Sequence, residues 1–126
     1  MTPELEAKLV EKFPALFVGS TYPLTVSLMA FGCECGDGWY GIIEDACEAI
    51  AKHCEEQKID GFAFMQIKEK FGSLRMYANI EDGYIGEVIG KAESKSGETC
   101  EKCGDAGTQN SSGYWISTLC ESCRAT

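Results

Sequence analysis

Eight cysteines occur in this 126-residue chain, and the last four have the spacing of a metal site. Cys100 and Cys103 form one C-x₂-C pair, sixteen residues follow, and Cys120 and Cys123 form a second pair. Two such pairs at this separation are typical of a zinc site, in which each pair makes a tight knuckle and four thiolates surround Zn²⁺ as a tetrahedron. Gly104 suits the positive φ that a turn after the first pair often needs. The alternatives are two disulfides or free thiols.

The predicted metal is structural rather than catalytic. Four protein ligands leave no open coordination position for a substrate. A segment of about 30 residues is too small to bury a sufficient core, so metal binding would supply its folding free energy. We therefore expect one structural Zn²⁺, which by itself does not name a function.

The other four cysteines are predicted to pack as small hydrophobic side chains. Cys47 and Cys54 lie on the apolar stripe of a predicted helix, where a free cysteine behaves like a small apolar residue. Cys33 and Cys35 would share a face only in an extended segment. The alternative is a second metal site that combines these cysteines with His53, the only histidine of the chain.

No catalytic residue is predicted. With a single histidine, neither a Ser–His nor a Cys–His nucleophile has a recognisable context. The glycine-rich stretch at 32–38 lacks the Lys and Ser/Thr of a phosphate-binding loop. A carboxylate pair among the 20 acidic residues stays open, although an acidic helix face is usually only solvated. The sequence therefore does not favour an enzyme.

Negative charge is concentrated in the first half of the chain. Residues 1–60 hold four Lys/Arg against eleven Asp/Glu, and the whole chain has a formal net charge of −9. Glu44, Glu48 and Glu55 belong to the exposed acidic face of a helix predicted over 37–57. Because affinity for nucleic acids depends on Lys and Arg neutralising phosphates, this balance favours a protein partner.

The basic cluster comprises Lys68, Lys70 and Arg75, with Tyr77 following it. Basic and aromatic side chains on neighbouring strands can bind single-stranded nucleic acid by stacking and charge. Three cations are few, so the alternatives are internal pairing with the acidic helix over 37–57 or simple solvation.

Hydrophobic periodicity predicts an α+β fold that positions these residues. Helical spacing of apolar residues predicts helices over 2–13, 37–57 and 82–93. Alternating or β-rich runs predict strands near 24–31, 62–68 and 73–78. We expect the strands to form a small antiparallel sheet packed with two or three helices, and the last two strands to be joined by four residues, 69–72.

The chain is expected to divide into a core domain over residues 1–96 and a zinc ribbon over 97–126, with the ribbon fold itself at 99–124. Before the ribbon, the stretch from Phe31 to Trp39 contains three glycines, at positions 32, 36 and 38. Such a density predicts a backbone that turns sharply or approaches another group closely.

No membrane or targeting segment is predicted. No run of about 18 apolar residues occurs, and the acidic N-terminus lacks the basic-then-apolar pattern of a signal peptide. Eight cysteines without a signal, four of them in zinc spacing, indicate a reducing compartment. We therefore expect a cytoplasmic protein that does not contact a membrane.

Three stretches together carry a resemblance: the G-D-G-W turn that ends at Trp39, the K-E-K-F-G-S-L-R hairpin at 68–75 and the four-cysteine ribbon. In this order they resemble a family of small proteins encoded by bacteriophages and prophages, over residues 28–123. The resemblance implies a phage or prophage origin, and hence the cytoplasm of a host cell, without implying an activity. Small acidic phage proteins often bind a host or defence protein.

We therefore expect a small acidic zinc-binding protein that acts as a protein–protein interaction module and modulates a host or defence protein. The acidic helix face or the ribbon surface would make the contact. The alternative is a nucleic-acid-associated zinc-ribbon protein that binds through Lys68, Lys70 and Arg75 with Tyr77.

Overall fold

The computed structural model describes residues 1–125 and contains helices, a three-stranded sheet and a two-stranded sheet. This architecture confirms the predicted α+β class. In chain order the elements are α1 (Pro3–Lys12), the 3₁₀ helices η1 (Pro14–Thr21) and η2 (Met29–Phe31), β1 (Cys33–Glu34), the 3₁₀ helix η3 (Asp37–Trp39), α2 (Tyr40–Glu56), β2 (Phe64–Lys70), β3 (Ser73–Ala78), α3 (Gly83–Ser96), β4 (Thr108–Ser112), β5 (Trp115–Leu119) and α4 (Glu121–Arg124).

The helix predicted over 37–57 is present as η3 followed by α2. Its apolar stripe places Ile43, Cys47 and Ile50 fully inside the core. This burial follows from their spacing of three and four residues, which puts all three side chains on one face of the helix.

The two other predicted helices are present as α1 and α3. The Asp82 carboxylate accepts a hydrogen bond from the Ile85 N–H at 3.0 Å and so caps the start of α3. At the other end of α3, the buried Ser96 hydroxyl accepts a hydrogen bond from the Leu74 N–H at 2.9 Å. Helix α3 is thereby fixed along the edge of β3.

Strands β2 and β3 form the predicted antiparallel hairpin, with Ile67 opposite Met76 on its buried face. The connecting turn has two residues, Phe71 and Gly72, rather than the four predicted, and their φ angles are 53° and 80°. Positive φ at both central positions is the pattern of a type I′ turn, whose twist matches that of the flanking strands. The short strand β1 pairs with β2 in parallel, so the three-stranded sheet is mixed rather than wholly antiparallel.

The strand predicted over 24–31 is wrong, because this segment forms turns and the 3₁₀ helix η2. Val26 is exposed, whereas its polar neighbour Ser27 is buried, which is the reverse of the burial expected for an alternating strand. The Ser27 hydroxyl contacts the Met65 carbonyl at 3.2 Å and accepts a hydrogen bond from the Met29 N–H at 3.1 Å. Side-chain hydrogen bonds of this kind offer the backbone an alternative to a strand ladder.

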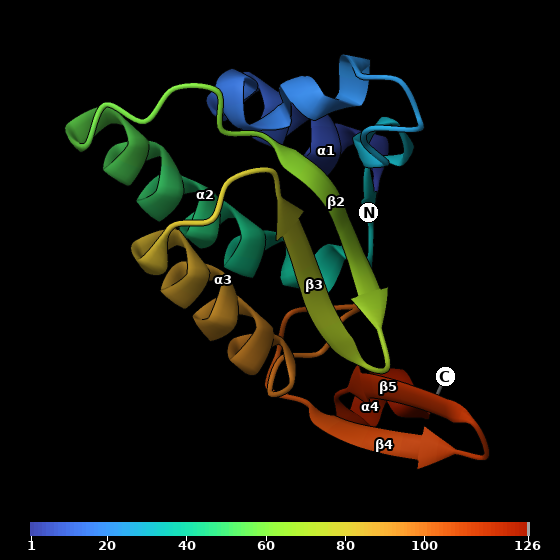
Figure 1. Ribbon diagram of the computed structural model, residues 1–126. Coiled ribbons are helices and arrows are strands. Elements are labelled where there is room, and N and C mark those ends of the chain that lie inside the picture. The colour runs from blue at the N-terminus through green and yellow to red at the C-terminus, as the bar shows by residue number, and fades with distance from the viewer. Residues whose placement is uncertain (126) are drawn as a thin grey trace.

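Helices α2 and α3 lie together along one flank of the β2–β3 hairpin, and α1, η1 and η2 gather at the end of the molecule opposite β4 and β5 (Figure 1). Side chains from the helices and the three-stranded sheet share one core. Its largest fully buried members are Leu9, Trp39, Ile43, Ile50, Phe64, Ile67, Leu74 and Ile85. None of the helices within residues 1–125 is both long enough and apolar enough to cross a membrane.

Candidate metal centre

The four C-terminal cysteines converge on one point of the structure. The sulfur atoms of Cys100, Cys103, Cys120 and Cys123 all lie within 4.8 Å of one another, and those of Cys103 and Cys120 are 3.7 Å apart. Four sulfurs held about 2.3 Å from a central ion at tetrahedral angles are separated by about 3.8 Å. The predicted ligands are therefore together in a geometry compatible with a metal ion. A disulfide would need a sulfur–sulfur distance of about 2.05 Å, far shorter than the Cys103–Cys120 separation.

Backbone hydrogen bonds shape the first knuckle, residues 100–105. The Cys100 N–H donates to the Asp105 carbonyl at 2.7 Å, and the Gly104 N–H donates to the Cys100 carbonyl at 2.9 Å. Gly104 has a φ of 85°, which is the positive φ expected at this position. The chain reverses here, so that both cysteines of the pair face the same point.

The β4–β5 hairpin carries the chain to the second pair of cysteines. The Cys120 sulfur accepts a hydrogen bond from the Cys123 N–H at 3.3 Å where α4 begins. The Arg124 guanidinium donates to the carbonyls of Thr108 and Leu119 at 2.8 and 3.0 Å, which ties α4 to the hairpin.

The surroundings of the cluster shift the pKa values of Cys100 and Cys123 in opposite directions. Burial disfavours the Cys100 thiolate, but hydrogen bonds from the backbone N–H groups of Cys120, Cys103 and Lys102 lower the pKa of Cys100 to about 6. The neighbouring sulfurs of Cys120 and Cys100 raise the pKa of Cys123 to about 12. A bound dication would favour the thiolate at every position, so metal binding would release protons.

The first knuckle docks on the glycine-rich stretch that precedes α2. The Gly38 N–H donates to the Glu101 carbonyl at 2.7 Å, and the Gly36 N–H donates to the Glu101 carboxylate at 2.9 Å. A Cβ atom at Gly38 would lie 2.1 Å from the Cys100 carbonyl oxygen, closer than any real contact. The close approach predicted for the glycine-rich stretch is confirmed at Gly36 and Gly38, and the group they approach is the first cysteine knuckle.

Trp39 adds a second contact to the same knuckle. Its side chain is fully buried in the core, and its indole N–H donates to the Thr99 carbonyl at 2.9 Å. This role of Trp39 could not be predicted from the sequence, because no local pattern identifies a partner sixty residues away. The glycines directly before the tryptophan were the only available signal.

The turn between β2 and β3 contacts the other side of the ribbon. The Gly72 carbonyl accepts a hydrogen bond from the buried Thr118 hydroxyl at 2.5 Å and a longer one from the Gln109 amide at 3.4 Å. Two of the stretches that carry the family resemblance, G-D-G-W and K-E-K-F-G-S-L-R, thus each contact the third. These contacts join the segment 97–125 to the segment 1–96.

The remaining cysteines do not assemble a second site. Among residues 1–125, the C-terminal cluster is the only group of three or more Cys, His, Asp or Glu side chains close enough to hold one ion. Cys33, Cys35 and Cys47 are buried in the core, and burial raises the pKa of each thiol, that of Cys33 to about 12. These positions match the predicted packing role, since a neutral buried thiol behaves as a small apolar group.

His53 links α2 to α3 and has no nucleophile as a partner. Its Nε2 lies 3.0 Å from the Asp82 carboxylate, and its ring stacks on Tyr84 with centroids 4.4 Å apart. The hydrogen bond from the Ile85 N–H and the contact with His53 lower the pKa of Asp82. The carboxylate therefore serves as a helix cap and a tie between the two helices.

The predicted acidic residues are in different environments. Glu44 is half-buried, and its carboxylate lies 2.8 Å from the Lys12 ammonium and accepts a hydrogen bond from the Tyr40 hydroxyl at 2.7 Å. The same two groups lower the pKa of Glu44. Glu48 and Glu55 remain exposed on α2. Part of the acidic face is thus neutralised by α1.

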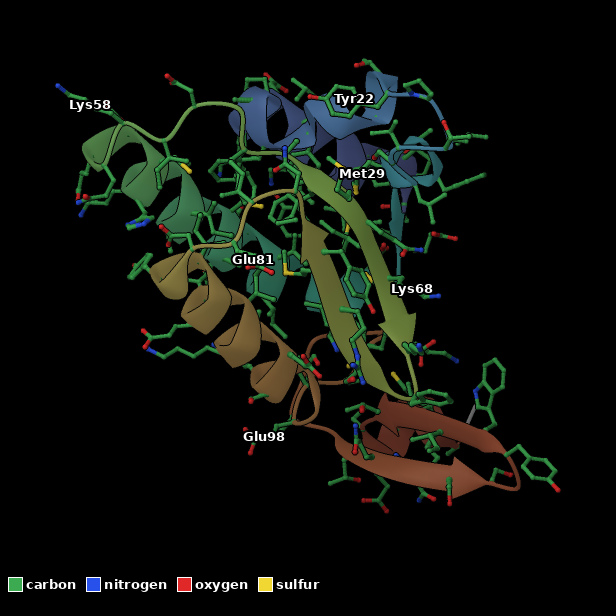
Figure 2. All side chains as sticks on the ribbon, viewed as in Figure 1. Tyr22, Met29, Lys58, Lys68, Glu81 and Glu98 are labelled. Carbon is green, nitrogen blue, oxygen red and sulfur yellow. The ribbon has the colours of Figure 1, made fainter. Side chains whose placement is uncertain are left out.

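The predicted basic residues follow the outer face of the β2–β3 hairpin. Lys68 lies opposite Arg75 in the register of β2 and β3. Its side chain points away from α2 and α3 (Figure 2). The Arg75 guanidinium lies 3.5 Å from the Glu93 carboxylate, so its internal partner is on α3 and not on the acidic helix. Tyr77 is partly exposed, and the Lys70 ammonium lies 5.7 Å from the centre of the Phe71 ring.

Three exposed aromatic side chains, Phe71, Tyr114 and Trp115, form what we call the aromatic tip. Tyr114 is fully exposed, Trp115 is 72% exposed and Phe71 is 62% exposed. A shallow groove of about 260 Å³ lies among them and is also lined by Glu69, Lys70 and Ile116. The sequence does not reveal the exposure of Tyr114 and Trp115, because exposure depends on how the β4–β5 hairpin docks.

Comparison of this chain with models of protein families, with curated proteins and with solved structures finds no match.

A substitution at Gly38 tests the contact between ribbon and core directly. We predict that Gly38→Ala lowers both the free energy of unfolding and the affinity for metal, because its Cβ would collide with backbone atoms of Cys100 and Gly104. Urea unfolding and competition with a chromophoric chelator measure the two effects.

Gly41→Ala is the matched control, since an added Cβ at this helical position meets no atom within 4 Å. We expect it to stabilise the protein by about 0.5–1 kcal/mol through its better helix propensity. Equal metal affinity in the Gly38→Ala variant and the wild type would contradict the proposed docking.

Proposed function

We propose that this chain is a structural-zinc protein that acts as a protein–protein interaction module and presents the aromatic tip to a partner protein. The observation that carries this proposal is the exposure of Trp115 and Tyr114, beside Phe71, on a ribbon docked to the core. Exposed aromatic side chains around a groove are typical of interaction hot spots, where Trp and Tyr supply most of the binding energy.

Zinc is supported by the chemistry of the ligands. Four cysteine sulfurs within 4.8 Å of one another suit Zn²⁺, and an ion with four protein ligands has a structural role. The ion would fix the two knuckles and, through Glu101 and Thr118, hold the hairpin against the core. A rigid hairpin lowers the entropic cost of presenting the aromatic tip to a partner.

A protein partner is favoured by the charges around the groove. Glu69 and Lys70 contribute one charge of each sign, and the whole chain has a net charge of −9. Such a balance does not attract a phosphate backbone. The resemblance to bacteriophage and prophage proteins suggests a host or defence protein in the host cytoplasm. Glu48 and Glu55 would contribute long-range steering rather than the contact itself.

A nucleic-acid function is the second candidate, and the outer face of the hairpin favours it. Lys68 and Arg75 are cross-strand neighbours there, and Tyr77 lies on the same face. Single-stranded nucleic acid could stack on Tyr77 while the two cations neutralise phosphates. A mobility-shift assay with a single-stranded oligonucleotide at low salt tests this candidate, which fails if no shift occurs.

We predict one Zn²⁺ per chain, with an affinity that falls as the pH is lowered from about 8 to about 5, because protons compete with the metal for the thiolates. Native mass spectrometry counts the ion, and chelator competition at several pH values measures the affinity. Absence of zinc, or an affinity independent of pH over this range, would contradict the proposed site.

We predict that Trp115→Ala weakens partner binding by about thirtyfold, the usual effect of removing a hot-spot residue. A partner is first recovered from bacterial lysate with the wild-type protein, and its dissociation constant is then measured with both proteins. Because Trp115 is largely exposed, the stability of the variant should match the wild type.

The double variant Glu48→Lys/Glu55→Lys is the matched comparison on the acidic helix. We expect it to slow association and change the salt dependence while leaving most of the affinity. Loss of binding in this variant, with full binding in Trp115→Ala, would move the contact from the aromatic tip to α2.

A further inference from the structure

The three rings of the aromatic tip stack on no other aromatic ring. The ring-to-ring contacts among residues 1–125 lie in the core and between α2 and α3, and none of them includes Phe71, Tyr114 or Trp115. The face of an aromatic ring carries negative electrostatic potential and attracts cations, most strongly in Trp. Three such rings line one groove of about 260 Å³, which therefore suits a positively charged group.

A carboxylate without a counter-ion lines the same groove. Glu69 is half-buried, and one of its carboxylate oxygens accepts a hydrogen bond from the Gly72 N–H at 2.7 Å. None of the ion pairs among residues 1–125 includes Glu69, and its second carboxylate oxygen accepts no hydrogen bond from these residues. A charge that is partly removed from water costs free energy until it is paired. A cationic ligand would supply the missing partner.

A cation of the chain itself already contacts one of the three rings. The Lys70 ammonium is 5.7 Å from the centre of the Phe71 ring, within the distance of about 6 Å at which an aromatic face attracts a cation. Tyr114 and Trp115 have no such contact with a Lys or Arg of residues 1–125. Two of the three rings are therefore still available to a cation from outside.

We infer that the groove of the aromatic tip binds an arginine side chain of the partner protein, through the rings and the Glu69 carboxylate. The inference rests on the proposed function, since it names the partner group that the tip contacts. A guanidinium is planar, so it can stack on a ring and pair with a carboxylate at the same time, and it is more weakly hydrated than an ammonium. Arginine is also among the residues that dominate binding energy at protein interfaces.

The charges of the molecule favour this occupant over others. A chain with a net charge of −9 attracts cationic segments and repels anionic ones. A phosphate or a carboxylate would approach Glu69 with a charge of the same sign. An apolar side chain would bury that carboxylate further without pairing it, which costs free energy. A guanidinium alone satisfies both the rings and the carboxylate.

Titration of the full-length, zinc-loaded protein with N-acetyl-arginine methylamide tests the inference by nuclear magnetic resonance. We expect a saturable shift of the indole N–H signal of Trp115. The only other tryptophan, Trp39, is buried and donates its indole N–H to Thr99, so its signal should stay in place as an internal reference. The citrulline analogue has nearly the same shape without the charge and should bind about fivefold more weakly.

Two substitutions in the groove separate the roles of its charges. Glu69→Gln keeps a carbonyl oxygen for the Gly72 N–H and removes the negative charge, so it should weaken arginine binding about fivefold. Lys70→Gln removes the competing cation at Phe71 and should strengthen arginine binding about twofold. Glu55→Gln is the matched control, because it removes one negative charge from the exposed face of α2 and should leave the affinity unchanged.

Absence of a saturable shift, equal binding of arginine and citrulline, or an affinity that is unchanged in Glu69→Gln would overturn the inference. Weaker arginine binding in Lys70→Gln would contradict the competition at Phe71 on which the inference depends. A shift caused by thymidine monophosphate and not by arginine would identify a nucleotide as the ligand instead. If Trp115→Ala disrupts the recovered complex while arginine does not bind, the proposed function stands and only the arginine ligand is wrong.

Discussion

The structure depends on the contact between the first cysteine knuckle and the glycines before α2. The Gly38 N–H and the Glu101 carbonyl meet at 2.7 Å, in a space that no side chain at position 38 could share. Trp39 follows at once and extends this contact into the core, where its side chain is fully buried. A segment too small to fold alone is thereby attached to a domain with an ample core. These few residues connect the first cysteine knuckle to the start of α2, so a metal bound by the four cysteines would stabilise both segments.

Much of this arrangement could be predicted from the sequence, because its signals are local. The C-x₂-C spacing identified Cys100, Cys103, Cys120 and Cys123, which the structure brings within 4.8 Å of one another. Helical periodicity identified α2, and β-rich runs identified the β2–β3 hairpin. The density of glycines before Trp39 even indicated a close contact.

What could not be predicted depends on contacts between distant segments. The alternation over 24–31 resembles a strand, but Ser27 is held by side-chain hydrogen bonds and Val26 is left exposed. The partner of Gly38 lies more than sixty residues away, and no local pattern names it. The aromatic tip likewise arises only when the ribbon docks beside the β2–β3 turn. Exposure and pairing are properties of the assembled fold.

We propose that a metal ion held by the four cysteines stabilises the ribbon and its contacts with the core as one unit. Hydrogen–deuterium exchange of the zinc-loaded and the chelated protein tests it most directly. We predict that chelation speeds exchange at 36–39 and 71–74 as well as at 98–124, because both core segments contact the ribbon. Faster exchange confined to 98–124 would show that the ribbon folds independently of the core and would contradict the claim.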